Sequence, residues 1–170
     1  STNNMQISLL ARVLRPLLLA LSVLSIMPVQ ALVIKGDVYG GGKSGNVGVE
    51  GTPTSTTVGI YGAEIIQIRT VFGGGQDGKV YGTTNVNING GTIGDGKWND
   101  TPYGGVYGAG EGAEATVYGT ANVNMVAGRV VNNIYGGGKM AALQGNTNVH
   151  LTGGTISGSV YGGARMADIQ

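Results

Sequence analysis

The chain contains no cysteine. No disulfide can therefore stabilise it, and no thiolate can act as a zinc ligand or as a nucleophile. Charged residues are scarce as well, at 11% of the 170 residues, and the formal net charge is +1. Proteins that bind nucleic acid or anionic lipid through charge carry a basic patch, which this composition does not supply. We therefore expect no nucleic-acid partner, and membrane contact only through an uncleaved N-terminal segment.

Proline occurs only 4 times, whereas glycine occurs 34 times, close to three times its usual share of about 7%. The glycines follow no strict Gly-X-Y period, which excludes a collagen triple helix. Hydrophobic residues reach 41%, enough apolar material to build an interior. The chain is therefore expected to fold.

Glycine follows an aromatic residue in a short phrase that returns five times. Successive copies start 33, 35, 28 and 26 residues apart, and periods in this range are typical of repeat architectures rather than of one ordinary globular core. The copies read VYGGG at 38–42, VFGGG at 71–75, VYGAG at 106–110, IYGGG at 134–138 and VYGGA at 160–164.

A second phrase lies between the aromatic copies, at residues 84–93 (TNVNINGGTI), 121–130 and 147–156, with an incomplete copy at 57–60. Its last apolar residue follows the preceding one by 5 positions in each copy, if Ile65 belongs to the incomplete one. A constant core with loops of varying length indicates stacked repeats. The spaced pairs are Ile60 and Ile65, Ile88 and Ile93, Met125 and Val130, and Leu151 and Ile156.

Polar and apolar residues alternate in this phrase, which predicts strands with one buried face. Glycine pairs at 90–91 and 153–154 supply the positive φ that corners require. We expect two inward columns, formed by Val58, Val86, Val123 and Val149 and by Ile60, Ile88, Met125 and Leu151. We expect an outward polar ladder of Asn85, Asn87, Asn122, Asn124, Asn148 and His150.

The predicted fold class is all-β. Because a strand cannot bury its face alone, each repeat must stack on the next at about 4.8 Å. Crossovers between parallel strands are right-handed in nearly all proteins, so we expect a right-handed parallel β-helix, or β-solenoid, of about five short coils. The alternative is a β-propeller, although its blades need about 40 residues each.

The first residues differ from the repeats, because no glycine precedes Gly36. Residues 5–31 have the order of a secretory signal peptide: Arg12 and Arg15, an apolar run at 17–27, and a cleavage-like end at Ala31. The alternative is an anchor helix, because residues 17–34 carry no charge and could span a bilayer. Residues 1–4 form an upstream segment before the plausible initiator Met5.

Residues 32–170 form the predicted solenoid. Its last six residues align with 139–144, after which the earlier copy continues into a strand. We therefore expect the repeat to be incomplete at its C-terminus.

The stretch YGGGKMAALQGNTNVHLTGGTISGSVYGGA, at 135–164, resembles the glycine-rich repeats of surface proteins of gut anaerobic bacteria, Bacteroidetes-like in character. More loosely, it resembles the passengers of autotransporter-type adhesins. The resemblance covers residues 38–170 and implies a repeat type rather than an activity.

We expect no catalytic residue, no metal and no cofactor. The residues at 40–44 read GGGKS, but the glycine that begins a phosphate-binding loop is replaced by Asp37. Aspartates near the glycines do not repeat with the spacing of calcium-binding nonapeptides. The nine carboxylates form no recurrent acidic face, and His150, the only histidine, occupies a ladder position.

The aromatic residues are the best candidates for ligand contact. If the residue before each aromatic points inward, the rings point outward and form a stripe, which suits sugar rings. Alternatively, the rings stack only to protect glycine-rich strands. The insert at 95–105 adds two more aromatic residues. The binding candidates are Tyr39, Phe72, Tyr107, Tyr135, Tyr161, Trp98 and Tyr103.

These features predict a secreted or bacterial cell-surface (outer-membrane) repeat protein with a structural or adhesive role. Host or microbial glycans or surface proteins are the candidate partners. A carbohydrate-active β-helix enzyme is one alternative, and it requires acidic side chains to converge in one groove. An ice-binding solenoid with a flat polar face is the other.

Overall fold

The fold is known from a computed structural model that describes residues 31–94, 96–98 and 101–170, with the side chains of 63–66 and of the insert at 95–103 left out of the description. The predicted upstream segment at 1–4 and signal peptide or anchor helix at 5–31 lie outside these residues, apart from Ala31. The described part is built from strands and loops, without a helix. Accordingly, it offers no helix that could span a membrane.

The strands vary greatly in length, from two residues to seventeen. The long ones come from the alternating phrase, whereas three of the four two-residue strands contain only the apolar residue and the aromatic residue that precede the glycines. In chain order they are β1 (Val33–Tyr39), β2 (Thr56–Phe72), β3 (Thr84–Ile93), β4 (Gly96–Trp98), β5 (Thr101–Tyr103), β6 (Val106–Tyr107), β7 (Ala121–Val130), β8 (Ile134–Tyr135), β9 (Thr147–Leu151), β10 (Thr155–Ile156) and β11 (Val160–Tyr161).

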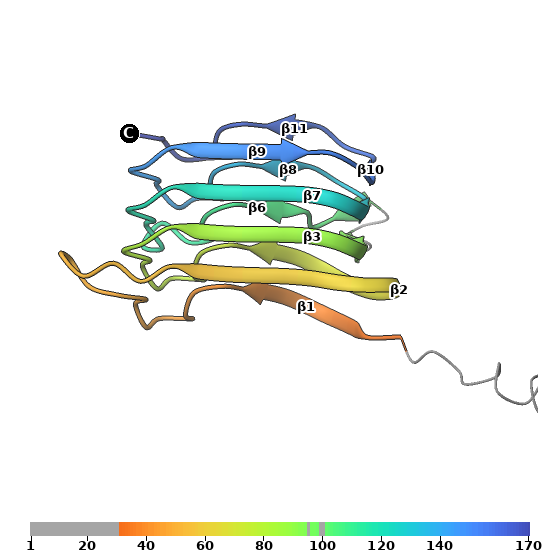
Figure 1. Cartoon of the computed structure of the whole chain (residues 1–170), viewed down its shortest axis with the longest axis horizontal. Coiled ribbons are helices and arrows are strands. Elements are labelled where there is room, and N and C mark those ends of the chain that lie inside the picture. The colour runs from red at the N-terminus through yellow and green to blue at the C-terminus, as the bar shows by residue number, and fades with distance from the viewer. Residues whose placement is uncertain (1–30, 95, 99–100) are drawn as a thin grey trace, which may run out of the picture. The chain divides into compact units, whose positions relative to one another are not determined.

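Successive repeats pair in parallel and in register, so that each repeat forms one rung of a curled sheet. Strands β2, β3, β7 and β9 lie side by side, and the short strands β6, β8 and β11 lie behind them (Figure 1). The only antiparallel strand pair described is the hairpin β4–β5 in the insert. A propeller blade consists of antiparallel strands, so this pairing does not fit the propeller alternative. The architecture is compatible with a β-solenoid.

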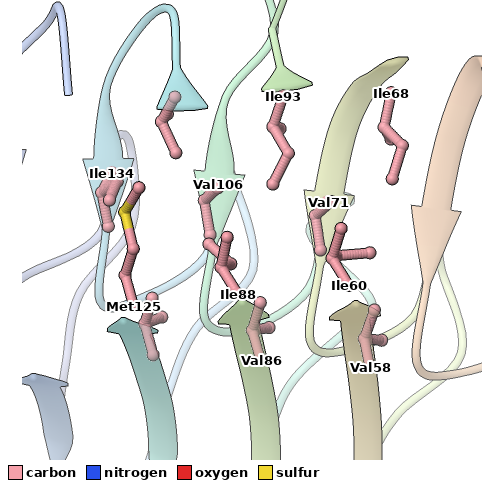
Figure 2. Packing of buried hydrophobic residues seen from close by; sticks show 12 residues of the cluster. Val58, Ile60, Ile68, Val71, Val86, Ile88, Ile93, Val106, Met125 and Ile134 are labelled. Atoms are coloured by element: carbon pink, nitrogen blue, oxygen red, sulfur yellow. The ribbon is translucent and has the colours of Figure 1, made fainter. Parts of the chain in front are cut away.

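The two predicted inward columns lie in the core. Val86 and Val123 are paired in register and fully buried, and Ile88 and Met125 follow them (Figure 2). Opposite them, Val106 and the equivalent residues of β2 and β8 complete the same hydrophobic cluster. Leu151 differs from the prediction, because it is 40% exposed. It lies on the last rung, where no further described strand covers it.

A third apolar column contains Ile68, Ile93 and Val130, and it shows that the predicted interval of 5 residues is wrong for the first copy. Ile93 pairs with Ile68 and not with Ile65, so in the first copy the last apolar residue follows Ile60 by 8 positions rather than 5. The register shifts between Gly62 and Gln67, where β2 takes up the additional residues. Burial decides the register here, because Ile68 is 1% exposed and belongs to the core cluster.

A fourth column was not expected from the sequence. Val80 and Val117 form parallel bridges to each other, and the series continues to Val47 on one side and to Leu143 and Ile169 on the other. With the small side chains of Ala109 and Ala121, the buried members make a second hydrophobic cluster. These columns pack the inner rungs against their neighbours, whereas on the last rung Leu151 and Ile169 are 40% and 39% exposed.

Glycine serves two different purposes in this fold. Gly90, Gly91 and Gly154 have φ of 142°, 74° and 92°, as predicted for corners, while Gly153 is not among the positive-φ residues. The glycine directly after the aromatic residue is needed for another reason on every described rung except the last, namely at Gly40, Gly73, Gly108 and Gly136. A Cβ at Gly108 would lie 2.2 Å from the carbonyl oxygen of Gly136 on the next rung. Close contact between rungs therefore requires glycine at this position.

Candidate functional site

The outer face of the long strands carries two ladders of asparagine side chains. Asn122 Nδ2 donates to Asn85 Oδ1 at 3.0 Å, and Asn148 Nδ2 donates to Asn122 Oδ1 at 2.9 Å. In the neighbouring column, Asn124 Nδ2 donates to Asn87 Oδ1 at 2.9 Å. The strand register produces these contacts, because it places each asparagine beside its equivalent on the next rung. The predicted polar positions thus lie together on one surface.

His150 occupies the ladder position next to Asn124 and is exposed. Its imidazole makes no hydrogen bond to another described residue. The second ladder therefore has an imidazole in place of an amide at its last rung. At its other end it stops at Gly59, which has no side chain and pairs with Asn87.

The five aromatic rings form the predicted column, but the predicted exposed stripe is wrong. Their centroids are 4.8 to 5.0 Å apart and their planes differ by at most 11°. Phe72 and Tyr107 are only 1% and 7% exposed, and Tyr161, on the last rung, is 47% exposed. Because neighbouring rings stack face to face, both faces of the three inner rings are occupied, and only the end rings, Tyr39 and Tyr161, keep one unstacked face.

Charged side chains contact the hydroxyl ends of this column. The Tyr39 hydroxyl donates to a carboxylate oxygen of Glu111, which also binds Lys139 Nζ at 3.0 Å. Asp37, 3.4 Å from the same hydroxyl, accepts two hydrogen bonds from Arg69, at 2.8 and 2.6 Å. Burial, followed by the hydrogen bond to Glu111, raises the pKa of Tyr39 above its ordinary value. The phenol therefore stays protonated and donates its hydrogen bond to Glu111.

Asp37 makes the fold sensitive to acid. Burial alone would raise the pKa of its carboxyl group, but the hydrogen bonds and charge of Arg69 outweigh burial, so the pKa lies below the ordinary 3.8. A lowered pKa stabilises the fold above the unfolded-state value, and this contribution is lost as the pH falls through the folded-state value. We expect the free energy of unfolding to drop below about pH 4, and to drop less in Asp37→Asn, in urea titrations at pH 7, 4 and 2.5. An identical drop in both proteins would contradict this assignment.

Two of the nine carboxylates, Asp37 and Glu111, thus converge on Tyr39. Each is held by a cation, Asp37 by Arg69 and Glu111 by Lys139. Glu50, Asp77, Glu114 and Asp168 are exposed on other loops, and the remaining acidic side chains, those of Glu64, Asp95 and Asp100, lie outside the described ones. Within the described part of the chain, no three histidine or acidic residues are grouped as metal ligands would be.

The insert forms the hairpin β4–β5, in which Trp98 pairs with Thr101 and Gly96 with Tyr103. The side chains of Trp98 and Tyr103 are outside the described ones, so their role as ligand contacts stays a prediction.

Sequence reasoning missed three tyrosines. Tyr81 and Tyr118 stack on each other with centroids 4.8 Å apart, and Tyr61 is 62% exposed on β2. The phrase Val-Tyr-Gly occurs at 80–82 and 117–119 without the further glycines, and it could have revealed the stacked pair. Tyr61 stands in the triplet Ile-Tyr-Gly at 60–62, which recurs at 134–136, but it lacks the further glycines.

No protein-family model, no curated protein and no solved structure matches this chain.

Proposed function

We propose that the chain is a right-handed parallel β-helix of a secreted or bacterial cell-surface protein, with a structural and adhesive role in which the outer asparagine face binds glycan. The asparagine ladders are the observation that carries the proposal. A side-chain amide has two N–H donors and a carbonyl oxygen with two lone pairs. A ladder contact uses one donor and one lone pair, so each inner amide retains hydrogen-bonding capacity toward the solvent.

The ladders also hold these amides in place before a ligand arrives. Asn122 both donates to Asn85 and accepts from Asn148, which restricts its side chain to one orientation. Binding then costs less side-chain entropy than it would for isolated surface amides. A row of fixed, neutral donors and acceptors suits the many hydroxyl groups of a glycan.

The absence of charge on this surface favours a neutral partner. The outward positions at 57–61, 85–89, 122–126 and 148–152 contain no Asp, Glu, Lys or Arg. The nearest charged residue along β7, Arg129, follows the corner at Gly128, which has φ of 96°. The signal-like leader supports export, and the resemblance to surface repeat proteins supports adhesion.

A glycan microarray probed with the labelled chain tests this proposal. We expect binding to at least one neutral glycan, and about tenfold weaker binding by the double variant Asn122→Ala and Asn124→Ala, equivalent to about 1.4 kcal/mol. The matched control, Ser157→Ala with Gln170→Ala, changes two exposed polar residues elsewhere and should bind as the wild type does. Equal binding by all three proteins, or no binding at all, would refute the proposed function.

The enzyme alternative has one observation in its favour, the approach of Asp37 and Glu111 to Tyr39. A catalytic acid requires a raised pKa, however, and the pKa of Asp37 is lowered. The ice-binding alternative needs a regular flat array, but the second ladder changes from Gly59 through asparagines to His150. Neither alternative explains the retained hydrogen-bonding capacity of the amides as well as glycan binding does.

A further inference from the structure

Tyr61 lies on the outer face of β2, with one edge of its ring against Gly59. A Cβ built on Gly59 would lie 2.1 Å from Cε2 of Tyr61 and 3.0 Å from the two ring atoms bonded to it, so the ring edge takes the space that a side chain at position 59 would need. Both residues point outward, because they are two positions apart on a strand whose Val58 and Ile60 are buried. Tyr61 is nevertheless 62% exposed, which leaves the ring open to the solvent.

An amide with an unused donor lies beside this ring. Gly59 pairs in register with Asn87 on the neighbouring strand, which lies about 4.8 Å away. Asn87 Oδ1 accepts from Asn124, but Asn87 Nδ2 has no hydrogen-bond partner among the described residues. The contrast with the other column is clear, because Asn85 Nδ2 donates to the Thr56 carbonyl oxygen. Glycine at position 59 provides no side chain for Asn87 and leaves room for the ring.

From this geometry we infer that Tyr61 and Asn87 form a subsite for one neutral pyranose unit of a glycan chain. The exposed ring packs against the C–H face of the sugar, and Asn87 Nδ2 donates to a sugar hydroxyl. Asn124, the next amide of the same ladder, lies in the direction in which a longer chain would continue. The inference rests on the proposed function and adds where on the face a sugar ring would stack.

The sugar must be neutral because no charged residue occupies an outward position of this face at 57–61 or 85–89. A uronic acid or a sulfated sugar would find no cation there to offset its loss of hydration. Tyr61 also differs from the other described aromatics. The rings of the column and the pair Tyr81–Tyr118 stack on one another, which occupies at least one face of each ring, whereas no ring stacks on Tyr61 among the described residues.

Affinity electrophoresis of the whole chain tests the subsite. The gels contain, one at a time, laminarin, galactomannan, dextran, hydroxyethylcellulose or the charged polymer polygalacturonate. We expect at least one neutral polymer to slow the wild type and Tyr61→Trp. We expect Tyr61→Ala and Asn87→Ala to bind it about five- to tenfold more weakly, as expected for the loss of one aromatic contact or one hydrogen bond. Met166→Ala, which alters another large exposed side chain outside this face, should migrate as the wild type does.

The outcomes separate the subsite from the proposed function. If a neutral polymer slows the wild type and Tyr61→Ala equally, the subsite is refuted while glycan binding stands. If no polymer slows the wild type, both are refuted. Stronger retardation by polygalacturonate than by every neutral polymer would refute the neutral ligand. Circular dichroism and the thermal midpoint of each variant confirm that it is folded, which is expected because the changed side chains lie on the outer face.

Discussion

Val123→Asp should abolish the cooperative fold of the repeats or destabilise it by more than about 4 kcal/mol, in the range of the most severe single substitutions. Val123 is fully buried between Val86 and Val149, its register partners on the neighbouring rungs. A carboxylate at this position would lose its hydration without gaining a cation or a hydrogen bond. Urea unfolding followed by circular dichroism near 218 nm, a β-sheet wavelength, measures the effect.

The matched control is Asn122→Asp, one residue earlier on the same strand. Asn122 points outward, and the substitution removes one donated hydrogen bond, to Asn85 Oδ1. The expected loss is about 1 kcal/mol, because a hydrogen bond at a half-exposed site contributes little net stability. Equal losses in the two variants would mean that the interior column is not dry, and the stacked architecture would have to be revised.

Gly108→Ala should destabilise the fold by about 3 kcal/mol or more through steric overlap alone. The new Cβ would lie 2.2 Å from the Gly136 carbonyl oxygen and 3.1 Å from Cγ2 of Val123. Neither neighbour can move freely, because Gly108 N–H donates to the Tyr135 carbonyl oxygen at 2.9 Å and holds the two rungs together. The midpoint of thermal unfolding should fall accordingly.

Gly162→Ala provides the control, because Gly162 holds the equivalent position on the last rung and a Cβ there would meet nothing within 4 Å. We expect a change of less than about 0.5 kcal/mol, as at an ordinary surface position. If both variants lose the same stability, glycine is needed at this position for backbone conformation and not for close contact between rungs.

The corrections to the sequence-based prediction come from particular residues. The interval of 5 residues predicted Ile65 as the inward residue of the first copy, yet Ile68 takes that place because β2 shifts register before Gln67. Local spacing does not reveal such a shift, since Ile65, Ile66 and Ile68 are all apolar. Only the pairing with Ile93 on the next rung distinguishes them.

The exposure of the aromatic column could not be predicted from local sequence either. Alternation correctly placed the rings on the other side of the strand from the buried Val71 and Val106, but it contains no information about what lies next to them. Glu111 reaches Tyr39 across 72 residues of chain, and Phe72 lies between the rings of Tyr39 and Tyr107, which belong to other rungs. Exposure of an outward side chain depends on these distant groups, so the predicted open stripe was wrong.

By itself, the sequence determined the repeats, their stacking and the inward and outward positions of the alternating phrase. This was possible because burial of every second residue is a local pattern, and stacking repeats it on each rung. The tertiary structure alone decided which outward aromatics are open. It buried Phe72 and Tyr107 and left Tyr61 exposed against Gly59, whose register partner is Asn87. The physical reason is that solvent access depends on neighbours across rungs, whereas side-chain direction depends on the strand itself.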